Sequence, residues 1–136
     1  MENTKSLSIS FYRNLGKLFF AIAATDKSVK DIEFSTLKDL VKTQWMPLDN
    51  IKDSYGTDTA FQIEIVFDWL NNDEELNATA CFNDFMLFKR QHENLFTEKV
   101  NRLIMDTASK IAESFSGKNK SELIMLAKLN IELKKP

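Results

Sequence analysis

The 136-residue sequence contains three glycines, two prolines, one cysteine and one histidine. So few glycines and prolines exclude a collagen-like repeat and argue against a β-sandwich or β-barrel, because those folds need many tight turns. Cys81 has no partner for an internal disulfide, and the absence of a CxxC pair or Cys/His cluster excludes a structural zinc site. The single histidine, His92, excludes two-histidine zinc hydrolases and di-iron helical bundles.

Long apolar runs are also missing. The most apolar stretch is residues 18–24, far short of the roughly 20 residues that span a membrane as a helix. The N-terminal sequence MENTKSLSIS lacks the apolar region of a secretion signal. We therefore expect a cytoplasmic protein without a transmembrane segment.

Charge is nearly balanced overall but unevenly distributed. The net charge is −2, whereas residues 49–75 hold eight acidic residues and one lysine, a balance of −7. Residues 97–136 hold eight basic and five acidic residues, a balance of +3. No basic stripe is present, so we expect no nucleic-acid partner, and we interpret the acidic stretch as a solvated surface.

Apolar and aromatic residues are plentiful, at 43% and 11% of the chain. This composition excludes disorder, and the length fits one domain over residues 1–136 with a self-sufficient core.

Helical periodicity dominates the first half of the chain. Apolar residues spaced three and four apart predict a first helix over about 10–25, a second helix that runs to Trp45, and a third over about 58–70. The second helix starts at Ser28 or Lys30, and Pro47 ends it.

The second half shows three further helices. The fourth helix carries an apolar stripe from Ala78 to His92. The fifth begins after Thr97, which would cap it, and stops near Gly117. Asn119 and Glu122 form an N-x-x-E capping box for a last helix through Leu133.

Six helices with mostly short connections predict an all-α fold, a single compact bundle of about six helices. We expect every apolar stripe to face the core, the phenylalanine-rich stripe of the fourth helix included. The third helix contributes Phe61, Ile65, Val66, Trp69 and Leu70.

A weak internal repeat relates residues 22–33 to residues 111–122 at a constant offset of 89. Both segments predict a helix, a polar turn and a second helix with a glutamate near its start, Glu33 or Glu122. The bundle would then be a pseudo-repeat of two helical hairpins.

The first of these hairpins, LGKLFFAIAATDKSVKDIEFSTLKDLV, resembles the tellurite-resistance TerB-like domains. In that family an apolar helix ends in Ala-x-x-Asp-Gly-x-Val-x-x-x-Glu, and Ala23, Asp26, Val29 and Glu33 hold the pattern here. The later segment IAESFSGKNKSEL would be the second hairpin. The resemblance covers most of the chain in layout and about fifteen residues in motif.

The resemblance implies a cytoplasmic all-α domain of paired helices, linked to stress responses such as tellurite resistance, with an acidic site proposed to bind metal ions. Two departures weaken such a site here. Lys27 replaces the motif glycine and adds a positive charge beside Asp26, and Phe115 stands where the second hairpin would have its aspartate.

Three carboxylates, Asp26, Asp31 and Glu33, are the candidate metal ligands. Oxygen ligands of this kind suit a divalent cation such as Ca²⁺, provided they converge on one point. Asp31 and Glu33 are two residues apart, about 200° around a helix, so both cannot face one ion without distortion. The alternative is that Asp31 and Glu33 only stabilise a helix N-terminus through its dipole.

An enzyme has less support in the sequence, and we expect none. Asp26 with Glu33, Asp84 with Glu93, or Cys81 with His92 are the pairs available. Cys81 and His92 would lie about 16 Å apart along a helix, too far for a thiol and its base.

A protein-interaction module without a metal site is the remaining alternative, because aromatic-rich helical bundles bind partner helices in grooves. The loop over residues 47–57 and the acidic edge through Glu75 are the candidate contacts.

Overall fold

The computed structural model describes residues 4–24, 31–45, 59–72, 77–113 and 120–134. Within them the chain is an all-α bundle of six α-helices, as the periodicity predicts. The helices are α1 (Thr4–Ala23), α2 (Asp31–Leu40), α4 (Gln62–Asn71), α5 (Ala78–Gln91), α6 (Glu98–Glu113) and α7 (Lys120–Leu133).

Three short helical segments complete the described part. A π-helical turn, η1 (Val41–Trp45), extends α2, and two 3₁₀ turns, η2 (Thr59–Phe61) and η3 (Glu93–Leu95), lie before α4 and after α5. The wider turn of η1 buries Val41 and Trp45 together, and the Trp45 indole Nε1–H donates to the Thr107 hydroxyl at 3.0 Å. This buried bond connects the end of the second helical segment to α6.

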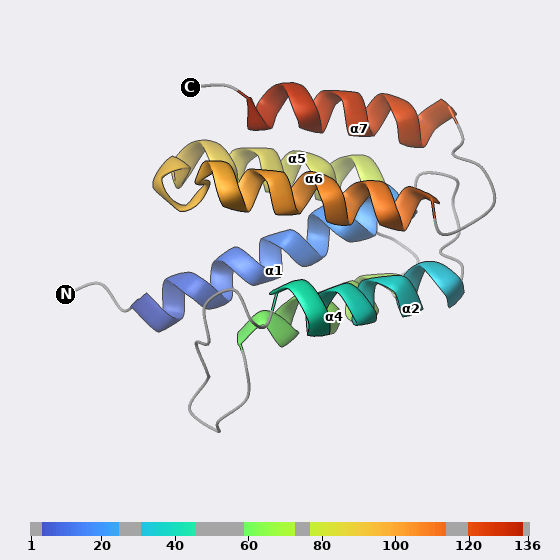
Figure 1. The fold of residues 1–136 in the computed structure, drawn as a ribbon, viewed down its shortest axis with the longest axis horizontal. Helices are drawn as coiled ribbons and strands as arrows, with labels where there is room; N and C mark the ends of the chain where they lie inside the picture. The colour runs from blue at the N-terminus through green and yellow to red at the C-terminus, as the bar shows by residue number, and fades with distance from the viewer. Residues whose placement is uncertain (1–3, 25–30, 46–58, 73–76, 114–119, 135–136) are drawn as a thin grey trace.

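The central helix is α1, which packs against α4 on one side and against α5 and α6 on the other. Figure 1 shows α7 outermost on one side of the bundle and α2 and α4 on the opposite side. Gly16 permits the close approach of α1 and α4, since a Cβ there would lie 2.8 Å from the Ile63 carbonyl oxygen. Glycine at this point therefore sets the distance between two helices.

Aromatic rings fill the core between these layers. Phe96, just after η3, meets Phe11 of α1 and Phe85 of α5 edge-to-face, with ring centroids 5.5 and 5.8 Å apart. Tyr12 packs edge-to-face on Trp45. The phenylalanine-rich stripe of α5 faces inward, with Phe82, Phe85 and Phe88 all buried, which confirms its predicted packing role.

Several predicted helix ends agree with the structure. The Thr97 hydroxyl accepts from the Val100 N–H at 3.2 Å and caps α6, as predicted. His92 is the residue at which α5 ends, and its Nδ1 lies 3.1 Å from the Phe88 carbonyl oxygen. An unpredicted cap starts α5, where the Asn77 side chain accepts from the Ala80 N–H at 2.7 Å.

Other predicted boundaries need correction or fall outside the described residues. The first helix begins at Thr4 rather than Ser10, because the polar N-terminal residues continue the helix without a breaker. The third helix ends within one residue of the prediction, at Asn71, but its α-helical part begins at Gln62, after the 3₁₀ turn η2. Both starts proposed for the second helix, and Pro47, Gly117 and Asn119, lie outside the described residues.

The predicted core stripe of the third helix is wrong in part. Phe61, Ile65 and Trp69 are exposed, while Ile63, Phe67 and Leu70 are buried. Seven of the ten residues 61–70 are apolar, so the periodicity alone could not select the inward face.

Candidate functional site

The predicted cation site is only partly within the described structure. Asp31 is the first residue of α2 and its side chain is exposed. Glu33 lies in the same turn of α2, but its side chain falls outside the described residues, as does the whole of Asp26. Among described residues, no group of three His, Cys, Asp or Glu side chains is placed to hold a metal ion. The site at Asp26, Asp31 and Glu33 therefore stays a prediction.

The Cys81 thiol does not have the environment of a nucleophile. It is buried on the inward face of α5, and burial first, and the nearby Asp84 carboxylate second, raise its pKa, with Lys17 opposing. A raised pKa keeps the thiol protonated, whereas a reactive cysteine needs a lowered one. The His92 ring is committed elsewhere, stacked on Phe88 with centroids 4.3 Å apart.

The carboxylates of Asp84 and Glu93 do not form a pair: Asp84 contacts a lysine, and Glu93 faces solvent. Asp84 makes an exposed ion pair with Lys17 of α1 at 3.4 Å. Glu93 opens the separate turn η3 and is exposed. The predicted contact loop over residues 47–57, and Glu75, lie outside the described residues.

Besides a hollow of about 530 Å³ between α6 and α7, the described surface has a groove between α5 and α7. Two hollows of about 300 and 380 Å³ adjoin at Phe82, Asn83 and Lys128, which line both, and we call the two together the α5–α7 groove. Phe82 and Met86 are buried beneath it. Its rim carries large exposed apolar side chains, namely Leu87 of α5 and Ile124 and Ile131 of α7.

Helix α7 has an unusual distribution of side chains. Its two glutamates, Glu122 and Glu132, are buried, while Leu123, Ile124 and Ile131 are exposed, Ile131 to 63%. A surface helix normally does the reverse. These apolar side chains therefore leave roughly half or more of their surface in contact with water.

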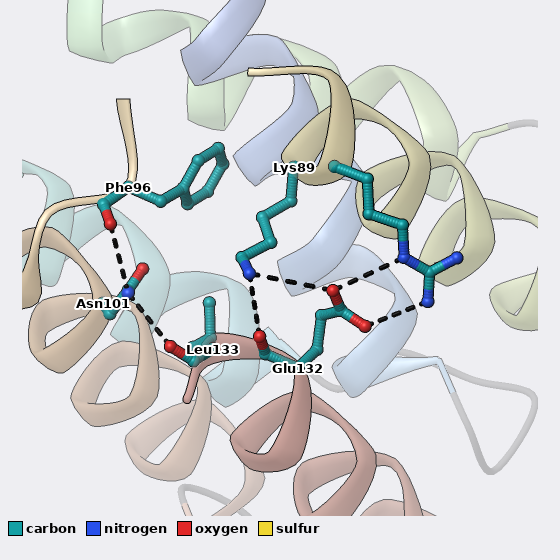
Figure 2. A network of polar contacts seen from close by, with 6 residues as sticks. Lys89, Phe96, Asn101, Glu132 and Leu133 are labelled. Atoms are coloured by element: carbon teal, nitrogen blue, oxygen red, sulfur yellow. Dashed lines mark hydrogen bonds and ion pairs between the residues drawn. The ribbon is translucent and has the colours of Figure 1, made fainter. Parts of the chain in front are cut away.

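A buried ion pair explains why Glu132 faces inward (Figure 2). Lys89 of α5 is 2% exposed and Glu132 is 5% exposed. The Lys89 ammonium donates to the Glu132 carbonyl oxygen at 2.8 Å and lies 3.7 Å from its carboxylate. Arg90 holds the same carboxylate from the solvent side, with its Nη2 at 2.9 Å. This bond, and then the charge of Glu132, raise the pKa of the Arg90 guanidinium.

Asn101 of α6 holds the same end of α7. Its side-chain amide donates to the Leu133 carbonyl oxygen at 3.1 Å and to the Phe96 carbonyl oxygen at 3.3 Å (Figure 2). The last carbonyls of a helix have no partner within the helix, and here Lys89 and Asn101 supply donors to two of them. These side chains fix the rotation of α7 about its axis, and with it the groove.

The exposed charged residues of segment 120–134 are lysines. Lys120, Lys128 and Lys134 are all exposed, and α7 has no exposed carboxylate because both its glutamates are buried. Lys128 lines both hollows, and no carboxylate of the described part of the chain lies within ion-pair distance of its ammonium group. The groove thus combines apolar side chains with Lys128 and with the paired charges of Arg90 and Glu132 at one end.

Helix α4, which lies on the opposite side of the bundle from α7 (Figure 1), carries a second exposed apolar surface, the α4 face. We define it as Phe61, Ile65 and Trp69, spaced four residues apart, with Trp69 64% exposed. Glu64 and Asp68 stand beside them, and α4 contains no basic residue. The charges that α4 itself places beside these apolar side chains are therefore negative.

Lys38 of α2 borders the α4 face. It lies over the Phe34 ring at 4.4 Å, and Phe34 stacks on Phe67 of α4. Partial burial raises the pKa of Glu64, and the charge of Lys38 opposes that rise.

Sequence reasoning missed the groove and the α4 face because every apolar residue was expected in the core. The sequence did contain a signal, an excess of apolar residues. Residues 61–70 contain seven apolar side chains in ten, and residues 123–127 are apolar without interruption. One face of a helix cannot accommodate all of them.

Comparison with protein-family models, with curated proteins and with solved structures finds no match for this chain. Within the residues that the structure describes, no helix combines the length and apolar character needed to cross a membrane.

Proposed function

We propose that this protein is a non-enzymatic binding module whose α5–α7 groove takes an amphipathic helix with acidic residues beside its apolar face. The observation that carries the proposal is the outward face of α7, where Ile124 and Ile131 flank Lys128 while both glutamates are buried. The TerB-like relationship, with its stress-associated cytoplasmic role and cation site, belongs to the same proposal on the strength of its motif.

The groove has the properties of a helix-binding site. Helix-in-groove recognition places apolar side chains at i, i+3, i+4 and i+7 into a hydrophobic channel. Large apolar groups that remain in water are favourable to cover, at about 25 cal/mol per Å². Leu87, Ile124 and Ile131 supply such groups on both walls.

The charge of the groove favours an acidic partner over a basic one. Lys128 stands at the junction of the two hollows, and complementary charge increases association rate and selectivity more than affinity. Arg90 is already paired with Glu132, so Lys128 is the group that selects for carboxylates. A concave surface also suits a helix better than a flat membrane.

A labelled synthetic peptide tests the proposal. The probe is an amphipathic helix of about four turns with leucines on one face and flanking glutamates, and its match has lysines in place of the glutamates. Fluorescence anisotropy should show binding of the glutamate peptide. Ile131→Ser and Lys128→Glu should each weaken it about tenfold, a change of roughly 1.4 kcal/mol.

Matched controls use exposed residues outside the groove. Ile32→Ser on α2 removes an apolar side chain of similar exposure, and Lys110→Glu reverses an exposed charge on α6. Both should leave peptide affinity unchanged. Equal affinity in groove and control variants, or preferential binding to vesicles of anionic lipid, would overturn the proposal.

A further inference from the structure

Two surfaces of this bundle are apolar and carry different charges on their own helices. The groove has Lys128 at its centre, and the α4 face has Glu64 and Asp68 beside Phe61, Ile65 and Trp69. We propose that the α4 face of one copy of this chain seats in the α5–α7 groove of a second copy. The inference rests on the proposed function in using the same groove, and it names an occupant.

Shape supports this pairing. The α4 face is a ridge along one side of a helix, because residues four apart lie one above another. The groove is a channel between two helices. Trp69 is the largest exposed apolar side chain of the described structure, and tryptophan is the residue most enriched where binding energy concentrates.

Charge decides which surfaces meet. Two α7 faces would oppose Lys120, Lys128 and Lys134 to their own copies, and two α4 faces would oppose Glu64 and Asp68. Like charges brought together disfavour both symmetric contacts. The α4 face against the groove instead brings Asp68 and Glu64 toward Lys128.

A contact between two different surfaces leaves one of each free on the pair. Such head-to-tail contacts continue into chains or close into rings. A single helix in a groove buries less than a standard interface, so the contact belongs to the weak class. We expect association only at high protein concentration, with a Kd on the order of tens of micromolar.

Trp69 offers a direct optical readout. The other tryptophan, Trp45, is fully buried and bonded to Thr107, so its emission should not depend on association. Rising concentration should shift the Trp69 emission to shorter wavelength as its indole leaves water. Sedimentation velocity on the same samples should show the average mass increasing. Trp69→Phe should abolish the spectral shift and retain association.

Complementation separates this contact from unspecific association. Trp69→Ser disables the α4 face and Lys128→Glu disables the groove, and each variant alone should remain monomeric. Each still has the surface that the other lacks, so an equimolar mixture should form a one-to-one pair and nothing larger. Asp106→Lys and Lys110→Glu, at exposed positions of α6, should associate like the unmodified chain.

The outcomes distinguish this inference from the groove itself. A chain that stays monomeric at every concentration, or a mixture that fails to pair, overturns self-association. If the acidic peptide still binds in a Lys128-dependent way, the groove function stands alone. Self-association that depends on Trp69 and Lys128 without any peptide binding would make a second copy the occupant and overturn the general peptide site.

Discussion

The buried pair between Lys89 and Glu132 should be the most costly polar contact to break. Lys89 and Glu132 have almost no access to water, and the ammonium depends on the Glu132 carbonyl at 2.8 Å and carboxylate at 3.7 Å. Glu132→Gln removes the negative charge and leaves a buried cation. We expect the free energy of unfolding to fall by about 3–5 kcal/mol, the usual cost of breaking such a pair.

The opposite single change should cost less. Lys89→Met removes the ammonium, but Arg90 still holds the Glu132 carboxylate at 2.9 Å and connects it to solvent. We expect a loss of about 2–3 kcal/mol, partly from the lost hydrogen bond between the Lys89 ammonium and the Glu132 carbonyl. The double variant Lys89→Met with Glu132→Met should lose less than the two single losses combined, because no unpaired charge remains buried.

Urea denaturation followed by far-ultraviolet circular dichroism measures these losses. The exposed pair of Lys17 and Asp84 provides the control, and Lys17→Met should cost less than about 1 kcal/mol. A loss below about 1 kcal/mol for Glu132→Gln, or additive losses in the double variant, would refute the account of how α7 is held.

Four further outcomes follow from the described contacts. Gly16→Ala should destabilise the fold by about 1–3 kcal/mol in urea denaturation, because the added methyl group would clash with α4. The cost of this overpacking exceeds the free energy that alanine gains over glycine in a helix. A more stable variant would contradict the close approach of α1 and α4. The pKa of Glu64 is raised by burial, so the fold loses stability as pH rises from about 4 through this pKa. Glu64→Gln should therefore raise the Tm at pH 7, and an equal rise at pH 3 would assign the effect to something other than charge. Ellman's reagent should modify Cys81 slowly in the native state and quickly in urea; fast native labelling would contradict its burial. The cation prediction requires Ca²⁺ or another divalent ion to stabilise chelator-treated protein, by about 2.7 kcal/mol at a hundredfold excess over Kd. The same ion should not change the thermal stability of Glu33→Gln. If no ion stabilises the unmodified protein, Asp31 and Glu33 are helix-start residues only.

The candidate surfaces were harder to predict than the helices that carry them. The stripe of α5 could be assigned correctly because its opposite face is polar, with Asn83, Asp84 and Arg90. In α4 the apolar residues surround the helix, and the inward set was decided by contact with α1 at Gly16. The exposed stripe is what remained after that contact formed.

The rotation of α7 depends on residues far away in the sequence. Glu132 faces inward because Lys89, 43 residues earlier, needs a buried anion and a carbonyl acceptor. Asn101, 32 residues before Leu133, holds the same end. The spacing of the buried Leu126, Leu129 and Leu133 indicates an inward face, but nothing within residues 120–134 accounts for an inward-facing glutamate.

The sequence by itself determined the all-α class, the approximate number of helices and local features such as the Thr97 cap, because periodicity and capping act over only a few residues. The tertiary structure alone decided which of several apolar faces became the core. That choice depends on long-range packing and on where buried charges find partners, as Lys89 does with Glu132. The same choice left the groove and the α4 face exposed to solvent.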